Sequence, residues 1–408
     1  MVDIGRVTAV WRYPVKSMAG ERLSAVTISD LGVHADRTWA VRDLRTDTTT
    51  SAKRLPGLMM CTARYARPPA PEAGPGRAPE VIIGFPDGSE VSSADPAVHR
   101  MLSEYVDHDV ELRPLPPVTD RAQYRAPIAT KTDMRTIFGL GPDDPLPDLS
   151  MFPLRKLAEI SRYATPVGSY VDAYEMHLLT EQSLHSMSVL APGSDFDVRR
   201  FRPSVLIDAP GTAELPELDW CGGVVQAPNC AISPLIPTIR CVMPTHPQPG
   251  LDRDPAVTRT IAANARRCLG VYGTVHTPGR IAEGDRLRLD PPDRSPLSST
   301  AGSAMKRAVM KAVSAALPRG RGSTRLGRGL EYALHGIEDA ERANAVRDRA
   351  AARRVGFPQD VVRYLLTYGL RDLPYLLASV DALDAYILGL KRPVAVPLGR
   401  AWLQQALS

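Results

Sequence analysis

Apolar and polar positions alternate along much of the first third of the chain, a pattern typical of β-strands with one buried face. Turn-forming residues separate the alternating stretches, which predict strands at residues 7–13, 23–28, 38–42, 81–85 and 90–92. Asp95 and Pro96 then supply the N-cap and first residue of a helix that ends near Val106. This part of the chain is therefore predicted to be β-rich.

The second part of the chain contains further short apolar stretches between turns. They predict strands at residues 176–179, 205–207, 224–226, 271–275 and 286–289, and a strand-like run at 239–243. Helices are predicted at 154–163, at 181–190 with Thr180 as N-cap, and from Asp254 to Gly270. Many short strands with few helices favour a barrel-like β architecture over a doubly wound sheet. No G-x-G-x-x-G or P-loop sequence supports a nucleotide cofactor.

The pattern changes after residue 290, where a stretch rich in Pro, Asp, Ser, Thr and Gly predicts a linker and is followed by helical periodicity. We predict a mainly β (α+β) fold with two β-barrel domains and an α-helical C-terminal extension. The predicted boundaries are residues 1–120, residues 121–290, a linker at 291–303 and the extension at 304–408.

The net charge of +5 arises in the C-terminal extension. Residues 303–354 contain 12 lysines and arginines but 5 acidic residues, so the rest of the chain is close to neutral. This segment either packs on the body as a helical bundle or docks an acidic partner, such as an electron-donor protein or an anionic membrane surface. Aromatic residues are not interleaved with the cations, so nucleic acid is not an expected partner. The candidate docking residues are Lys306, Arg307, Lys311, Arg319, Arg321, Arg325 and Arg328.

Cysteine usage and hydropathy predict a cytoplasmic protein, either free or peripheral to the membrane. The five cysteines are an odd, scattered set without a C-x-x-C pair, which suits a reduced compartment and offers no structural zinc motif. The first 12 residues lack the pattern of a signal peptide. The uncharged run at residues 220–239 contains three prolines and two glycines, so it is not expected to span a membrane.

Cys241 is the candidate reactive residue. It lies beside Arg240 in an apolar run that leads into a proline-rich loop at residues 244–250. A thiolate is both a nucleophile and a soft metal ligand, and it forms most readily beside a cation. The alternative is that Cys241 is a small buried hydrophobic residue, which is the commoner role of a lone cysteine in a strand.

Cations at three places in the chain are candidates for binding an anion. Lys16 and Ser17 follow the first predicted strand, where they can clasp a phosphate or simply form a solvated turn. Arg37 is either a second cation of such a site or a rim residue that packs on Trp39. A third group precedes Pro203 and suits bidentate recognition of phosphate or carboxylate, with a solvated basic face as the alternative. This group consists of Arg199, Arg200 and Arg202.

The histidines show no spacing typical of metal ligands. His177, His185 and His246 are each interpreted as a surface residue or as a core residue with satisfied hydrogen bonds.

Several motifs in this order resemble a known family. Residues 10–17 (Val-Trp-Arg-Tyr-Pro-Val-Lys-Ser) and 36–39 (Asp-Arg-Thr-Trp) resemble the β-barrel domain that precedes MOSC domains, named after the C-terminal domain of molybdenum cofactor sulfurase. Residues 200–203, 240–243 and 278–285 resemble the MOSC domain itself. The resemblance covers residues 1–290, and it assigns residues 1–120 to the N-terminal MOSC-associated β-barrel domain and residues 121–290 to the MOSC domain.

The resemblance extends to amidoxime-reducing-component type enzymes and implies a molybdenum cofactor, Mo-molybdopterin. It implies that Cys241 ligates molybdenum. It also implies a pterin-binding set that includes two positions, Ser204 and Thr245, where the chain departs from the usual family residues. That implied set is Lys16, Ser17, Arg37, Arg200, Arg202, Ser204, Arg240 and Thr245. Pyridoxal phosphate is linked to the family only through a fused cysteine-desulfurase domain that is missing here, so it is not expected.

Three functional hypotheses follow. The first is a molybdenum-dependent oxidoreductase that reduces small N-hydroxylated or N-oxide substrates with electrons from an external partner protein, since no flavin, haem or Fe–S motif is present. The second is a sulfur carrier in which Cys241 bears a persulfide for the assembly of a metal–sulfur centre. The third is a non-catalytic cofactor-binding protein.

Overall fold

The computed structural model describes residues 1–127, 129–292 and 347–348. They divide into two compact units, the larger including residues 1–127, 135–147 and 159–292 and the smaller including residues 129–134 and 148–158. The helices α2 (Lys131–Phe138) and α3 (Leu154–Arg162) begin in the smaller unit and end in the larger one. The predicted linker, extension and docking segment lie outside the described residues, apart from 291–292 and 347–348.

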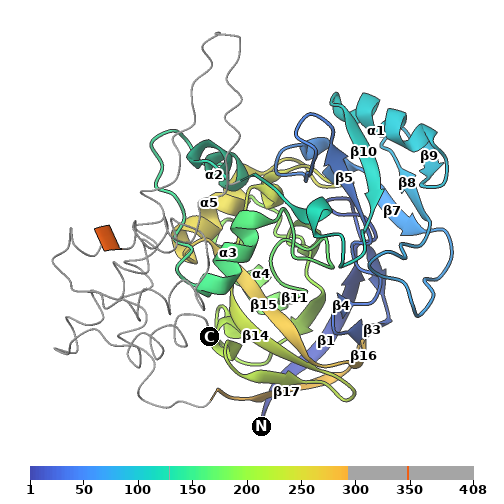
Figure 1. Cartoon of the computed structure of the whole chain (residues 1–408). Helices are drawn as coiled ribbons and strands as arrows, with labels where there is room; N and C mark the ends of the chain where they lie inside the picture. The colour runs from blue at the N-terminus through green and yellow to red at the C-terminus, as the bar shows by residue number, and fades with distance from the viewer. Residues whose placement is uncertain (128, 293–346, 349–408) are drawn as a thin grey trace. The chain divides into compact units, whose positions relative to one another are not determined.

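Within the described residues, seven strands of the larger unit close into a barrel (Figure 1). Each strand pairs with the next and the last pairs with the first; only the β11–β12 pair is parallel. A short strand, β2 (Glu21–Leu23), adds to the outer side of the first. In order around the barrel the strands are β1 (Val2–Arg12), β12 (Val205–Asp208), β11 (Met176–Thr180), β15 (Cys268–Thr277), β14 (Ala231–Ile239), β13 (Val224–Gln226) and β17 (Arg286–Asp290).

The barrel is filled by the apolar residues of its alternating strands, among them Val10, Val205 and Val271, none of which is exposed. Because β1 from the N-terminal part pairs with β12 and β17, hydrogen bonds cross the predicted boundary at residue 120. The mainly β fold with a barrel is confirmed, and the division into two domains at residue 120 stays a prediction.

Two small sheets and one helix surround a second core in the N-terminal part, whereas a third small sheet, formed by residues 25–29, 32–33 and 279–282, contributes its buried residues to the barrel core. Helix α1 (Ala97–Val106) packs in the second core; it starts one residue later than predicted, with Pro96 as its N-cap, and Asp95 accepts a hydrogen bond from the amide of Ala97 (2.9 Å). Met243, from the distant loop after β14, also belongs to this core. The sheets are β16 (Gly279–Ala282), β3 (Ala25–Ser29) and β4 (Gly32–Val33); β10 (Val110–Pro114), β5 (Trp39–Asp43) and β6 (Thr48–Thr49); and β7 (Thr62–Tyr65), β8 (Val81–Gly84) and β9 (Glu90–Ser92).

Two helices pack together beside the barrel in a third cluster of buried residues. Helix α4 (Glu181–Leu190) starts at the predicted N-cap, since Oγ1 of Thr180 accepts a hydrogen bond from the amide of Ser183 (3.2 Å). Helix α5 (Pro255–Asn264) starts at its predicted N-cap, Asp254. Single-turn 3₁₀ helices occupy Pro56–Met60, Arg121–Tyr124, Val198–Arg200, Pro216–Trp220 and Met243–Thr245.

Some predicted limits of the elements are wrong. Helix α5 ends at Asn264 rather than at Gly270, because Arg266 and Arg267 adopt positive φ values of 49° and 65° that reverse the chain before β15. The predicted strand at 23–28 is divided between β2 and β3. The predicted run at 239–243 only begins at the end of β14, which contains Pro234 and Pro237 and absorbs them through register shifts.

Among the helices of the described residues, none is both long and apolar enough to cross a membrane.

Candidate functional site

Cys241 lies two residues beyond the end of β14, in a loop that backbone hydrogen bonds hold on both sides. The amide of Arg240 donates to the carbonyl of Arg267 (2.8 Å), and that of Val242 donates to the carbonyl of Ile137 (2.9 Å). Cys241 is half-buried and packs against the N-terminal core. The loop therefore holds the thiol in a defined place and leaves part of its surface exposed.

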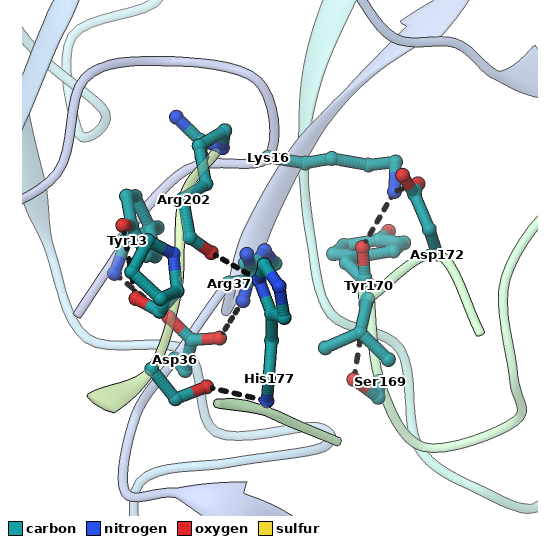
Figure 2. A network of polar contacts seen from close by, with 12 residues as sticks. Tyr13, Lys16, Asp36, Arg37, Ser169, Tyr170, Asp172, His177 and Arg202 are labelled. Carbon is teal, nitrogen blue, oxygen red and sulfur yellow. Dashed lines mark hydrogen bonds and ion pairs between the residues drawn. The ribbon is translucent and has the colours of Figure 1, made fainter. Parts of the chain in front are cut away.

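Three guanidinium groups, termed here the arginine cluster, act on the buried Tyr13: those of Arg37 and Arg202 lie over its ring, and that of Arg240 lies over the ring of Phe201. The Cζ atoms of Arg37 and Arg202 lie 4.8 and 4.1 Å from the ring centre. Burial raises the pKa of Tyr13, and this effect outweighs the attraction of the three arginines. One carboxylate, that of Asp36, pairs with Arg37 and accepts a hydrogen bond from the amide of Tyr13 (2.7 Å; Figure 2).

Two buried N–H groups of the arginine cluster lack an acceptor. Nη1 of Arg202 donates to the carbonyl of Met18 (2.5 Å), and Nη2 of Arg240 donates to that of Phe201 (2.9 Å). Nη2 of Arg202 and Nε of Arg240 have no hydrogen-bond partner among the described residues. Burial, followed by the charge of Arg37, lowers the pKa of Arg202 to about 10. Because buried, incompletely paired cations are costly, this cluster favours an anionic ligand.

Backbone strain coincides with the cluster. Ser17, Arg37 and Arg202 have positive φ values of 72°, 48° and 54°. Such values are uncommon for residues other than glycine, and they persist where the surrounding structure enforces them, often at functional sites. Three of the predicted site residues are therefore held in conformations that local sequence preference does not favour.

Two lysines share the carboxylate of Asp172, and Figure 2 shows one of them, Lys16. Nζ of Lys16 lies 2.6 Å from Oδ1 of Asp172 and donates to the carbonyl of Tyr170 (2.8 Å), while Nζ of Lys53 lies 2.8 Å from Oδ2 of Asp172. Burial lowers the pKa of Lys16 to about 8 against the attraction of Asp172. Burial also acts on Lys53, but the attractions of Asp172 and then of Cys241 leave the pKa of Lys53 raised. Lys53 thus connects the shared carboxylate electrostatically with the thiol.

Replacing Asp172 by asparagine should destabilise the protein by about 1–2 kcal/mol at pH 7, because both lysines lose their counter-charge at a position that is about one-third exposed. Burial opposes ionisation of Asp172, yet Lys16 and Lys53 lower its pKa well below 3.8. The contribution of the carboxylate is therefore complete above pH 3.8 and is lost as the pH falls below that value. Urea unfolding of both proteins at pH 7, 5 and 3 tests this; a difference that persists unchanged at pH 3 would contradict it.

Arg200 is placed differently from Arg202. Only 2% of it is exposed, and its guanidinium donates to carbonyl oxygens on two loops, Asp195 (2.8 Å), Pro244 (3.1 Å) and Asp252 (2.8 Å). The Arg200 side chain therefore fastens the loop that follows Cys241. Its neighbour Arg199 pairs with Asp197 at a partly exposed position.

The predicted hydroxyl residues have local partners. Oγ of Ser17 accepts a hydrogen bond from the amide of Ala52 (2.9 Å), and Oγ of Ser204 accepts one from the amide of His177 (3.2 Å). Oγ1 of Thr245 lies 2.8 Å from that of Thr258. Ser17 belongs to the strained loop beside the lysines, whereas Thr245 joins its loop to α5.

Lys53, Asp172 and His177 were not among the predicted site residues. Their sequence surroundings carry no motif: Lys53 follows a Thr/Ser-rich stretch, and Asp172 lies in a turn before β11. The Lys16–Asp172 pair spans 156 residues of sequence. A basic or acidic residue in a polar turn between strands was the one sequence feature that could have pointed to Lys53 and Asp172.

In the described part of the chain, no group of three or more His, Cys, Asp or Glu side chains is arranged to hold a metal ion. The observed features define a β-barrel protein with a buried arginine cluster, one member of which, Arg240, precedes the half-buried Cys241 in the chain. Residues 4–77 match the family model of the MOSC N-terminal beta barrel domain, and residues 167–288 match that of the MOSC domain. These matches confirm the MOSC N-terminal β-barrel domain and the MOSC domain that the sequence motifs predicted. MOSC domains are associated with molybdenum cofactor sulfurase-like proteins.

Residues 339–403 match a third family model, described as the Hda lid domain. This match falls in the predicted C-terminal extension, and only residues 347–348 of it are described by the structure. The motif analysis had assigned no family to this region.

No curated protein matches the chain. Among solved structures, the YUAD protein from Bacillus subtilis is similar at 10% identity over 70% of this chain and 94% of that chain, with a TM-score of 0.31. A second structure, titled as a hypothetical protein, is similar at 12% identity over 28% of this chain and 50% of that chain, with a TM-score of 0.22.

Proposed function

We propose that this protein binds a molybdenum cofactor with Cys241 as the protein ligand to molybdenum and reduces N-hydroxylated or N-oxide substrates. The observation that carries the proposal is the arginine cluster, where buried N–H groups of Arg202 and Arg240 lack acceptors in the same site region as a half-buried cysteine. An anionic cofactor would give these groups acceptors and offset their charge.

The donor set fits a phosphate-bearing pterin. Arg202 and Arg240 would donate through their unpartnered N–H groups, and Arg37 and Ser17 would add charge and a hydroxyl at strained positions of the same region. Lys16 would act together with Asp172. Arg200 is not part of this set, because its guanidinium is already bound to loop carbonyls.

When bound, the cofactor would supply two-electron oxygen-atom chemistry at molybdenum. Reduction of an N–OH group to N–H also consumes two protons and releases water. Lys16 has a pKa of about 8, so its ammonium group can give up and regain a proton near neutral pH, while the Asp172 carboxylate stays ionised and holds it in place. The chain would thus contribute the metal ligand, anion binding and proton supply, and an electron-donor protein would contribute the electrons.

A holoprotein made in a host that synthesises the cofactor should oxidise a chemically reduced viologen dye when an N-hydroxylated amidine or a tertiary amine N-oxide is added. Cys241→Ser should lose this activity, and the surface variant Arg199→Met should keep it. Molybdenum-loaded protein that oxidises no dye with either substrate would contradict the reductase proposal.

The sulfur-carrier function is the second candidate, and the half-buried position of Cys241, in a loop held by backbone hydrogen bonds on both sides, favours it. Such a carrier would release sulfur to cyanide in proportion to protein, and Cys241→Ser would release none. Cyanide-releasable sulfur without substrate-dependent dye oxidation would therefore select the carrier.

A further inference from the structure

His177 lies between the two arginines that have unpartnered N–H groups, Arg202 and Arg240. It is buried on β11, with Nδ1 3.3 Å from the carbonyl oxygen of Arg202 and Nε2 3.4 Å from Nη1 of Arg240. Figure 2 shows its ring facing the Arg202 backbone. One imidazole therefore contacts the main chain of one arginine and the side chain of the other.

The chemistry of the partners fixes the state of the ring. A guanidinium can only donate, so Nε2 of His177 accepts from Arg240, and Nδ1 carries the proton that it donates to the carbonyl of Arg202. Burial and then the charge of Arg240 lower the pKa of His177 well below its usual value, outweighing the carbonyls of Arg202 and Leu269. The residue is thus a neutral bridge that an imidazolium could not replace.

The surroundings of His177 hold the ring in this position. Its amide donates to Oγ of Ser204 (3.2 Å) and its carbonyl accepts from the amide of Ser204 (2.8 Å). The ring packs on Tyr272, with a centroid separation of 5.6 Å. Gly270 leaves the necessary room at a φ of +80°, where a Cβ atom would meet Nε2 at 2.4 Å. Glu217 in turn accepts a hydrogen bond from the amide of Gly270 (3.1 Å).

We propose that His177 is a positioning residue that holds Arg202 and Arg240 together as a single anion-binding pair. The inference rests on the anion site of the proposed function but not on molybdenum. The Nδ1–H bond supports the strained backbone of Arg202, and the Nε2 acceptor occupies one nitrogen of Arg240. The remaining N–H groups, Nη2 of Arg202 and Nε of Arg240, are left for the ligand.

The test is binding of inorganic phosphate to the full-length protein by titration calorimetry, with three variants. His177→Phe keeps the aromatic packing but removes both hydrogen bonds, and it should weaken phosphate binding about 10-fold or more. His177→Gln places an amide oxygen where Nε2 accepts, so it should bind within roughly 3-fold of the unmodified protein. In an Arg240→Met background, His177→Phe should have a smaller effect than in the unmodified protein, because the part of its action that goes through Arg240 is already lost.

Thermal unfolding of each variant separates positioning from folding. Equal loss of binding in His177→Phe and His177→Gln, or full additivity with Arg240→Met, would overturn the inference, as would an unmodified protein that binds no phosphate. A holoprotein that loads molybdenum equally with His177→Phe would refute the inference and leave the proposed function standing. Phosphate binding that depends on His177, in a protein that holds no molybdenum, would support the inference and contradict the proposed function.

Discussion

Replacing Arg202 by methionine should weaken anion binding by roughly 10- to 100-fold while changing the stability of the ligand-free protein by less than about 1 kcal/mol. The two effects separate because Arg202 is buried and incompletely paired: its Nη2 lacks an acceptor, and burial with the charge of Arg37 lowers its pKa to about 10. In the free protein the variant loses one hydrogen bond, to the carbonyl of Met18, but also removes a poorly compensated cation. Only the liganded protein loses a strong, charge-assisted interaction.

Phosphate titration and urea unfolding of the same preparations test this separation. Arg199→Met is the matched control: Arg199 pairs with Asp197 where 41% of its side chain is exposed and donates to the carbonyl of Pro249 (3.0 Å), so the variant should keep its affinity for phosphate and lose about 1 kcal/mol of stability at most. A strongly destabilised Arg202→Met protein that keeps its affinity for phosphate would show that Arg202 is structural.

Replacing Arg200 by methionine should mainly lower stability rather than anion affinity, and it should destabilise the protein by about 3 kcal/mol. Its guanidinium donates to the carbonyls of Asp195, Pro244 and Asp252, and the methionine would leave these buried acceptors without partners. The loop that follows Cys241 would lose its main attachment to the segment before β12.

Urea unfolding measures the loss of stability, and alkylation of Cys241 by iodoacetamide under native conditions measures the loosening of the loop. Both should change far more in Arg200→Met than in Arg199→Met, which removes only one hydrogen bond to this loop, at the carbonyl of Pro249. Unchanged stability of Arg200→Met, or equal stability loss in the two variants, would refute the structural role.

The sequence could predict that the arginines before Pro203 matter, but it could not assign their roles. The three arginines are close in sequence, yet their contacts differ. Arg199 pairs with Asp197 at the surface, Arg200 fastens a loop, and Arg202 belongs to the arginine cluster. The differences depend on the single turn of 3₁₀ helix at 198–200 and on a positive φ of 54° at Arg202. Neither the turn nor the φ value follows from local preference.

More of the fold than of the site could be predicted from the sequence. Alternation of apolar positions located most strands and the starts of α1, α4 and α5, because caps and buried faces are local features. Closure of the barrel through β1 and the end of α5 depend on distant pairings, such as β1 with β12 and β17. For the same reason the sequence did not identify Lys53, Asp172 and His177 as site residues, since their partners lie far away in the sequence.

The central claim is that Cys241 ligates molybdenum, and X-ray absorption at the molybdenum edge tests it most directly. The holoprotein should contain near-stoichiometric molybdenum and pterin. Its Cys241→Ser variant should show one sulfur neighbour fewer at the metal, or a loss of molybdenum altogether. An unchanged sulfur environment with full molybdenum content in Cys241→Ser would contradict the assignment of this cysteine, and absence of molybdenum and pterin from the unmodified protein would contradict the account as a whole.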